Sequence, residues 1–491
     1  MKDSNRLIAP APWVFRIALV IALVLLIPSF LGREIHNDEA WIGQHVWTLL
    51  NHGQVESELF RDYPPLDQPI VVYHKLLTWI GASVAWCCGW GLYQLRAVSF
   101  IAGLLTLFLI FNHCARAGYR DLHWRVIAIL TFTPVFWLQM LEFRPEALLM
   151  LCGFASFLIL TQARKSDSIL LYAAAGLLAG AAGLTHAFGF VFVIAGFVTL
   201  LFFRKFVPAA IVLIFGIIAF APYVSGLFTD RELFLQQTIH NPLMTTSLNL
   251  NWWQPFVNMV TEHKRLLRKP EVIGITVWML IALFTINRDF WRRFRFEFIY
   301  LITMALVLAA SPLPKFTRYM IPLVPFMAII IAAVWSKLGS LAVGWRRNLR
   351  TVFLAWSLVF FGYGLYALVF AAIPAKPNPI KANQQMSELM RPGALVMAPF
   401  DFVYMQQGKF TIQSWWGAER LAGAQKSSNY LEHYADSLGV DYLVADELAI
   451  KTWGIQETNI TAAFSRYQLL LAIPLQHRYL FGKSDAATRK D

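Results

Sequence analysis

Long apolar runs are the feature that most constrains this 491-residue chain. An α-helix needs roughly 20 apolar residues to cross the hydrocarbon core of a bilayer. Inside a bilayer the backbone N–H and C=O groups must be satisfied within the segment, so long apolar runs cross as helices. The sequence therefore predicts an α-helical polytopic membrane protein with about eleven spans. The expected spans are 13–31, 97–114, 126–142, 147–163, 169–185, 188–203, 207–228, 272–287, 297–312, 319–337 and 351–373.

The composition agrees with this assignment. The chain is 57% hydrophobic and 14% charged, whereas soluble domains carry about 25% charged residues. The net charge of +13 comes mostly from Lys and Arg in short loops between apolar runs, a pattern that sets membrane topology and gives no indication of nucleic-acid binding. The four cysteines lie in apolar segments without metal-ligand spacing, so neither a disulfide framework nor a zinc site is expected.

Residues 66–90 decide the topology. Hydropathy alone would count them as a further span, but that choice would turn the basic loops outward. Treating them as a juxtamembrane helix on the outer face keeps these loops on the cytoplasmic side with the N-terminus. Three tryptophans in the segment suit a helix that lies at the membrane interface. The basic loops are 116–125, 164–165, 204–205, 288–295 and 337–350.

The same topology divides the chain into two domains. Residues 1–373 form a transmembrane domain with two large outer loops, 33–96 and 229–270. A proline-rich linker then leads to 380–491, where alternating apolar runs such as Ala394–Ala398 and Val440–Val444 predict strands between helices. A small C-terminal α/β domain on the outer face is expected. The sequence shows no internal repeat, which argues against a repeat-based transporter.

Asp38 and Glu39 directly follow the first span. Adjacent carboxylates cannot lie unpaired in hydrocarbon, so they belong at the membrane–water boundary. One interpretation is that Asp38 removes a proton from a substrate there. The alternative is structural, because acidic residues favour the N-terminus of a helix such as 38–50.

Three further polar motifs fall on the same face. Asp67, in the turn Tyr63–Pro69, either caps the following helix or binds a ligand. Arg144 and Glu146 lie in a very short turn between two spans, where proline and glutamate also suit a helix start. The third motif occupies residues 315–325.

In that third motif, Arg318 and Tyr319 either form part of an interface belt or clamp a phosphate. His186, at a span boundary, is a weaker candidate, since a lone histidine is more often structural. The basic residues Lys264, Arg265 and Arg268 lie on the outer face, where they could attract lipid headgroups or one lipid phosphate.

Together these motifs resemble those of the GT-C membrane glycosyltransferases. The resemblance covers about residues 10–340 and is greatest to the bacterial group that contains the aminoarabinose transferase of lipid A and relatives of protein O-mannosyltransferases. It rests on the outer-face Asp38-Glu39, the Pro-Pro-Leu turn, Arg144-Pro-Glu146 and Arg318-Tyr-x-x-Pro-Leu-x-Pro. It implies a GT-C fold and transfer of one sugar from a polyprenyl-phosphate carrier to an acceptor on the outer face.

The resemblance also implies roles for single residues. Asp38 matches the catalytic carboxylate, with Glu39 beside it. Asp67 and Glu146 match positions that hold a divalent metal ion in the aminoarabinose branch. Arg318 and Tyr319 match the motif near the lipid phosphate.

One departure from that branch concerns the turn at Asp67-Gln68-Pro69, where the branch has Glu-Lys-Pro. The lysine that would meet the phosphate is absent, so use of a metal and the identity of the sugar stay open. The basic run at 264–269 could supply the missing charge.

The predicted function is an inverting glycosyltransferase of the bacterial inner membrane that acts on lipopolysaccharide or a related envelope glycan at the periplasmic face. A sugar phosphate already has a good leaving group, so the reaction needs a base for the incoming hydroxyl and positive charge for the departing phosphate. Two alternatives remain: a protein O-glycosyltransferase of the same superfamily, and a transporter or lipid flippase.

Overall fold

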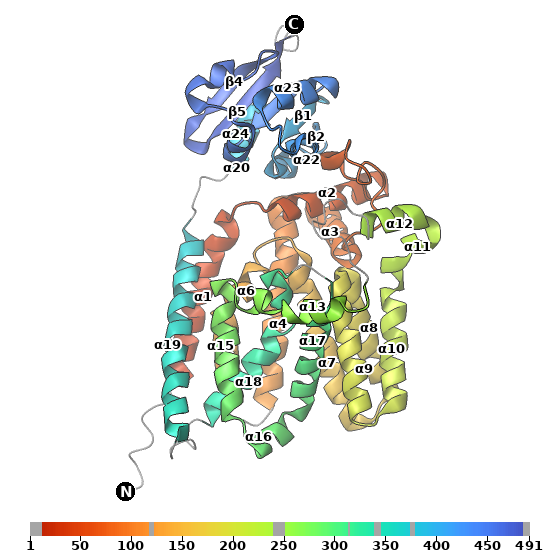
Figure 1. The fold of residues 1–491 in the computed structure, drawn as a ribbon, viewed down its shortest axis with the longest axis vertical. Coiled ribbons are helices and arrows are strands. Elements are labelled where there is room, and N and C mark those ends of the chain that lie inside the picture. Colours follow the sequence, from red (N-terminus) through yellow and green to blue (C-terminus); the bar gives the residue numbers. More distant parts are fainter. Residues whose placement is uncertain are drawn as a thin grey trace.

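In the computed structural model the chain forms a helix bundle with a small α/β domain stacked on one end (Figure 1). The structure describes residues 12–116, 122–238, 251–312, 315–337, 345–373 and 379–484. We call the end of the bundle next to the α/β domain the outer end, following the topology expected from the sequence.

Helices lie at each position where the sequence predicts a span. Within the described residues, five helices are long and apolar enough to cross a membrane: α1, α4, α7, α10 extended by η3, and α19. The others are shorter, so the number of spans stays a prediction. The bundle helices are α1 (Pro12–Gly32), α4 (Leu92–Arg116), α5 (Leu122–Thr131), α7 (Pro145–Ser166), α8 (Ile169–Thr185), α9 (Val191–Phe202), α10 (Phe206–Phe220), α15 (Pro270–Thr285), α17 (Arg295–Ala310), α18 (Val324–Ser336) and α19 (Trp345–Ala372).

The expected continuous span at 126–142 is interrupted. Helix α5 ends at Thr131, and a short helix, α6 (Pro134–Leu138), follows. Proline has no N–H to donate, its ring clashes with the carbonyl four residues earlier, and it disfavours helical backbone at the preceding residue. Pro134 therefore ends α5 and frees the chain to turn toward Arg144.

The first outer loop carries α2 (Asn37–His52), η1 (Glu58–Phe60) and α3 (Lys75–Cys88). The 14 residues of α3 extend about 21 Å. Figure 1 shows α2 and α3 at the outer end, and the basic helix α16 (Arg288–Arg293) at the opposite end. This arrangement agrees with the juxtamembrane helix expected within 66–90.

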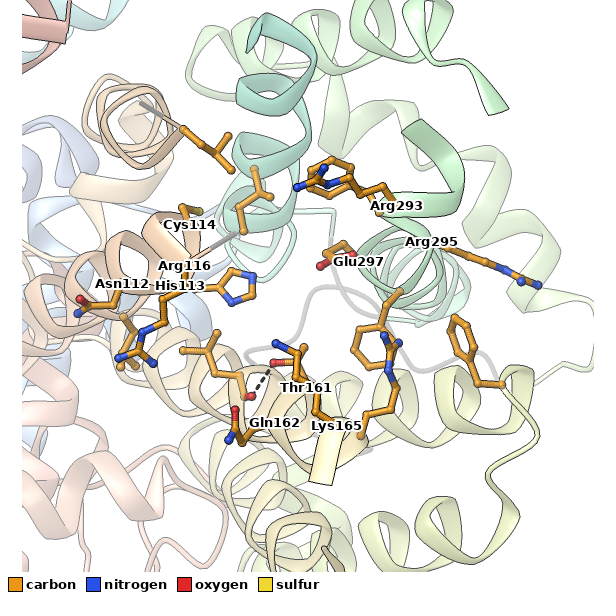
Figure 2. A pocket seen from close by; sticks show the side chains of 18 of the residues that line it. Asn112, His113, Cys114, Arg116, Thr161, Gln162, Lys165, Arg293, Arg295 and Glu297 are labelled. Atoms are coloured by element: carbon orange, nitrogen blue, oxygen red, sulfur yellow. Dashed lines mark hydrogen bonds between the residues drawn. The ribbon is translucent and has the colours of Figure 1, made fainter. Parts of the chain in front are cut away.

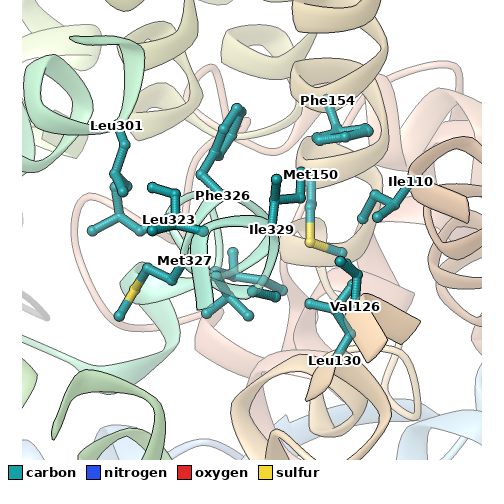
Figure 3. Close-up of a cluster of buried hydrophobic side chains, with 14 of the residues drawn as sticks. Ile110, Val126, Leu130, Met150, Phe154, Leu301, Leu323, Phe326, Met327 and Ile329 are labelled. Atoms are coloured by element: carbon teal, nitrogen blue, oxygen red, sulfur yellow. The ribbon is translucent and has the colours of Figure 1, made fainter. Parts of the chain in front are cut away.

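Helix α18 lies in the centre of the bundle. Its residues Val324–Trp335 are all buried, as expected for a helix that is apolar on every side. Figure 3 shows side chains of α18 packed against Met150 and Phe154 of α7 and against Val126 and Leu130 of α5. Close packing of this kind fixes the outer ends of α7 and α18, which lie next to the motifs of Arg144 and Arg318.

Short elements lie in the connections between the bundle helices, among them the second outer loop and the late motif. They are η2 (Ala187–Phe190), η3 (Ala221–Val224), α11 (Gly226–Thr229), α12 (Arg231–Thr238), α13 (Gln254–Val260), α14 (His263–Leu266) and η4 (Thr317–Met320).

The C-terminal domain is a five-stranded sheet in the order β2-β1-β3-β5-β4. The expected strand runs near 394–398 and 440–444 correspond to β1 and β3. Strands β1, β2 and β3 are parallel, and β5 pairs antiparallel with both β3 and β4. The elements are α20 (Pro379–Ser387), β1 (Leu395–Ala398), η6 (Phe400–Phe402), α21 (Val403–Gln406), β2 (Thr411–Ser414), α22 (Trp415–Ala422), α23 (Ser428–Ser437), β3 (Tyr442–Ala445), α24 (Glu447–Trp453), η7 (Glu457–Ala462), β4 (Tyr467–Ile473), η8 (Pro474–Gln476) and β5 (Arg478–Lys483).

This domain is joined to α2 by direct hydrogen bonds. The Tyr404 hydroxyl donates to the backbone carbonyl of Glu39 at 2.7 Å, and Gln44 donates to Gln407 at 3.0 Å. A Cβ on Gly43 would lie 2.6 Å from the Tyr404 hydroxyl oxygen, so glycine is what lets Tyr404 approach the helix so closely. The C-terminal domain thus helps to hold the helix that carries Asp38.

Candidate active site

Asp38 lies in the first turn of α2, at the outer end of the bundle. The N-cap residue His36 accepts a hydrogen bond from the Asp38 N–H at 3.1 Å, and the His36 N–H donates to the Glu39 carboxylate at 3.4 Å. This reciprocal cap satisfies two orphan donors and fixes the start of the helix. The Asp38 side chain is 41% exposed and remains accessible to a substrate.

Arg144 meets Asp38 from the start of α7. Pro145 occupies the first turn of that helix, which leaves Arg144 extended at the N-cap position. Arg144 Nη1 lies 2.9 Å from Asp38 Oδ2, and Arg144 Nε and Nη2 donate to Glu146 at 3.3 and 3.2 Å. One guanidinium therefore bridges two carboxylates.

Arg318 of η4 makes a second bridge between the same carboxylates. Its Nη1 lies 3.6 Å from Asp38 Oδ2, and its Nε lies 3.7 Å from Glu146 Oε1. The Arg318 guanidinium also lies over the ring of Phe316, 4.5 Å from its centroid. These separations are too long for direct hydrogen bonds, so the Arg318 guanidinium lies close to both carboxylates and keeps N–H donors available for another ligand.

The two arginines determine the charge state of Asp38. Partial burial raises the pKa of Asp38, but the positive charges of Arg144, His36 and Arg318 together lower it by more, so the pKa lies below the ordinary value of 3.8. Asp38 is thus a carboxylate at neutral pH.

His186 and Tyr319 lie together beside this cluster. Their ring centroids are 5.7 Å apart, and Tyr319 also packs against Phe188. His186 Nδ1 accepts the Phe188 N–H at 3.3 Å, which leaves Nε2 as the protonated donor of the neutral ring. Burial lowers the pKa of His186 well below 6.5, and His74 and Arg318 act in the same direction, so the ring is neutral.

His74 is a neighbour that the sequence did not single out. Its ring stacks on His186 at 4.9 Å, and its Nδ1 donates to the Thr185 carbonyl at 3.1 Å. Burial lowers the pKa of His74 to about 4. Since His74 immediately precedes α3, this contact connects the juxtamembrane helix to the site.

Glu39 does not lie where the catalytic role expected for it would require. Its side chain is fully buried and paired with Arg96 at 2.7 and 2.8 Å. The remaining bonds come from the backbone N–H groups of Phe143 and His36, at 2.8 and 3.4 Å. Four donors occupy the acceptor capacity of a carboxylate, so the structure shows Glu39 as an anchor that holds α2 against α4.

The residues present do not fit the divalent metal ion that the resemblance implies at Asp67 and Glu146. Asp67 is exposed in its loop, whereas Glu146 is buried and faces two guanidinium groups. Within the described ranges, no three His, Cys, Asp or Glu side chains come together as a metal site. We therefore derive no step through a metal.

The basic run of the second outer loop is split. Arg265 is fully buried and lies 3.2 Å from Glu262, which also pairs with Lys315 at 2.9 Å. Its helix, α14, contacts η4, the element that carries Arg318 and Tyr319. Lys264 and Arg268 are exposed, and the structure describes no ion pair for either of them.

Further charged residues support the cluster, and the sequence reasoning missed them. Glu142 lies 3.8 Å from Arg144 Nε and accepts a 2.7 Å hydrogen bond from Arg33 Nε. Both Arg33 and Glu142 stand at the outer end of an apolar run. A charged residue at that depth needs a partner, and this signal could have found them.

A cavity of about 620 Å³ adjoins the cluster. Arg33, His36 and Glu142 line its polar side, and α19 lines its apolar side with Tyr366 and Phe370, which are 64% and 63% exposed. The cavity is therefore amphipathic, and its apolar side continues onto the exposed face of the bundle.

Comparison with known proteins gives the fold. No protein-family model matches the chain, and no curated protein matches its sequence. The crystal structure of ArnT from Cupriavidus metallidurans bound to undecaprenyl phosphate is similar, with a TM-score of 0.60 and 13% identity over 96% of this chain and 98% of that chain. The archaeal oligosaccharyltransferase AglB from Archaeoglobus fulgidus, in complex with an inhibitory peptide and a dolichol-phosphate, is similar with a TM-score of 0.51 and 14% identity over 95% and 74%. Both belong to the GT-C superfamily, so the expected GT-C fold is confirmed.

Proposed function

We propose that this chain is an inverting membrane glycosyltransferase that moves one sugar from a polyprenyl-phosphate carrier to an acceptor at the outer end of the bundle. The observation that carries the proposal is the double bridge in which Arg144 and Arg318 both contact Asp38 and Glu146. A carboxylate and two guanidinium groups that share one site support the proposal, because this reaction needs a base and positive charge for the departing phosphate.

In the proposed reaction Asp38 accepts the proton of the acceptor hydroxyl as its oxygen attacks the anomeric carbon. The bond between that carbon and the phosphate oxygen breaks, and the electron pair leaves with the phosphate. Arg144 and Arg318 stabilise the negative charge that develops there. Direct displacement by a hydroxyl on the opposite side of the sugar inverts the configuration.

Donor binding also changes the pKa of the proposed base, Asp38. A phosphate that engages Arg144 and Arg318 competes with Asp38 for their charge. The pKa of Asp38, held low by these cations, then rises, because an opposite charge is what favours its ionised form. Asp38 becomes a better proton acceptor once the donor is in place.

Two further groups suit the departing phosphate. The Nε2–H of the neutral His186 ring is a hydrogen-bond donor, and the Tyr319 hydroxyl adds another.

The amphipathic cavity beside the cluster gives a lipid-linked substrate a route to Asp38. Its exposed tyrosine and phenylalanine side chains on α19 are suited to a hydrocarbon chain, and Arg33 and His36 are suited to a polar head. A polyprenyl-phosphate donor is supported by the ArnT and AglB structures, which hold undecaprenyl phosphate and dolichol-phosphate respectively.

For the acceptor we propose lipid A, lipopolysaccharide or a related envelope glycan at the periplasmic face of the bacterial inner membrane. A second candidate is transfer to protein hydroxyls, and the observation in its favour is the inhibitory peptide bound to AglB.

Envelope lipids and proteins from strains that carry wild-type protein, Asp38→Asn or Glu388→Gln test these proposals by mass spectrometry. Glu388 is an exposed carboxylate of the C-terminal domain and serves as the control. We expect Asp38→Asn to lower transfer by about 10²–10⁴-fold with unchanged expression and insertion. Wild-type turnover by Asp38→Asn would reject Asp38 as the base, and a sugar lost only from glycoproteins would select the second candidate. Movement of substrate across vesicles without any glycosylated product would indicate a transporter.

A further inference from the structure

A second cavity lies at the end of the bundle opposite Asp38. Its volume is about 700 Å³, and its walls come from α4, α7, α16, α17 and neighbouring residues (Figure 2). Helix α7 joins the two ends: Glu146 stands in its first turn and Lys165 in its last. At 1.5 Å per residue, these residues are about 28 Å apart along the helix axis. The proposed transfer reaction does not use this cavity.

The cavity has a strong excess of positive charge. Figure 2 shows His113 and Glu297 at the cavity, with Lys165 from α7 and Arg293 from α16 near it, whereas the Arg295 side chain extends away from its centre. Glu297 is the one carboxylate that the structure describes in its lining. The six Lys and Arg residues in the lining are Arg116, Arg164, Lys165, Arg292, Arg293 and Arg295.

Two of these cations are held in place by aromatic rings, and among the described residues the structure gives neither of them an ion pair. The Arg164 guanidinium lies 4.3 Å from the ring centroid of Phe296 and 5.1 Å from that of Phe203. The Arg295 guanidinium also lies over the Phe203 ring, 5.3 Å from its centroid. Such contacts orient a guanidinium and leave its N–H donors available for an anion.

The lining also reaches the apolar outside of the bundle. Phe108 lines the cavity and is 61% exposed. Leu105 and Ile101, one and two turns earlier on the same face of α4, are 45% and 53% exposed. A bilayer would place acyl chains against this face, next to the basic lining.

Charges that only set topology need loops in water and no cavity. Here six cations surround a recess that is continuous with an apolar helix face. We propose that this cavity binds the phosphate headgroup of an anionic phospholipid, with its acyl chains along the exposed face of α4. Basic pockets between membrane helices on this side are suited to such headgroups.

The test measures binding of dioctanoyl phosphatidylglycerol to the full-length protein in detergent, by native mass spectrometry and by the shift in thermal unfolding. Dioctanoyl phosphatidylcholine has the same chains without net charge, and glycerol 3-phosphate has a phosphate without chains. We expect phosphatidylglycerol to bind more tightly than either.

The variant Lys165→Gln/Arg292→Gln removes two exposed cations from the lining. We expect its Kd for phosphatidylglycerol to rise at least about fivefold, since one basic residue near an anionic lipid contributes about that factor. The control Arg288→Gln/Arg350→Gln removes two charges from outside the cavity lining and should change the Kd less than about twofold. The charge-conserving variant Lys165→Arg/Arg292→Lys should retain binding, which separates loss of charge from misfolding.

Unchanged phosphatidylglycerol affinity in Lys165→Gln/Arg292→Gln would overturn the proposal. Equal affinity for phosphatidylcholine would do so too, because the headgroup charge would then contribute nothing. Equally tight binding of glycerol 3-phosphate would identify a site for free phosphate compounds and would reject the lipid.

Discussion

Arg144 Nη1 lies 2.9 Å from Asp38 Oδ2, so the proposed base is paired with a cation before any substrate is present. The same guanidinium donates to Glu146 at 3.2 and 3.3 Å. An arginine shared between two carboxylates is well suited to exchange one of them for a phosphate, because its fork of donors fits either.

The pairing predicts a pH effect. Burial raises the pKa of Asp38 and Arg144 is the strongest influence that lowers it, so Arg144→Gln removes the lowering and leaves the burial. The pKa of Asp38 then rises, the base is protonated at a higher pH, and activity is lost earlier as the pH falls. We expect the acid limb of kcat/KM to move up by at least about one pH unit.

The measurement is the pH profile of the residual activity. Arg144→Lys, which keeps the positive charge, serves as the matched control and should stay nearer the wild-type profile. An acid limb that does not move in Arg144→Gln would show that Arg144 does not set the ionisation of the base.

The buried pair of Glu39 and Arg96 predicts a large stability effect. Both side chains are fully buried, so Glu39→Ala leaves the Arg96 guanidinium without its carboxylate. Loss of one partner of a buried pair costs about 3–5 kcal/mol of unfolding free energy. Thermal unfolding in detergent, compared among Glu39→Ala, Arg96→Met and the double variant, checks this. The double variant should be clearly less destabilised than the sum of the singles, and additive losses would mean that the pair is not coupled.

The contact between Gly43 and Tyr404 predicts a stability effect. A methyl group there would meet the Tyr404 hydroxyl oxygen at 2.6 Å, so Gly43→Ala should destabilise the protein by about 1–3 kcal/mol as an overpacked site. The matched control is Gly362→Ala in α19, where a methyl group has nothing within 4 Å and replaces a helical glycine. That change should be neutral or slightly stabilising.

Hydrogen exchange of the C-terminal domain shows where the effect of Gly43→Ala arises. Faster exchange around Tyr404 is the expected result. A Gly43→Ala protein as stable as Gly362→Ala would show that the close approach of Tyr404 to α2 is dispensable.

Chelators should have little effect on transfer. The Glu146 carboxylate faces Arg144 and Arg318, and Asp67 is exposed in its loop. We therefore expect EDTA to change the initial rate of transfer by less than about twofold, since guanidinium groups supply the positive charge that a metal would otherwise contribute. Loss of activity that returns on addition of Mg²⁺ or Zn²⁺ would contradict this expectation.

The sequence by itself determined the positions of the helices, the short helix outside the bundle and the side on which the acidic and arginine motifs fall. These properties are local. A run of apolar residues must become a helix in a bilayer, and the positively charged loops indicate its direction. Arg144, Glu146 and Arg318 could therefore be placed at the same end as Asp38 without coordinates.

Only the tertiary structure decided which charge meets which. Asp38 and Glu39 are adjacent and chemically alike, yet Asp38 is partly exposed and Glu39 is bound by Arg96, 57 residues away. Pro134 ends a helix that hydropathy extends to 142, and Asp67 is exposed whereas Glu146 is buried. The physical reason is that an ion pair depends on distances of a few ångströms between packed helices, and hydropathy along one chain carries no information about those distances.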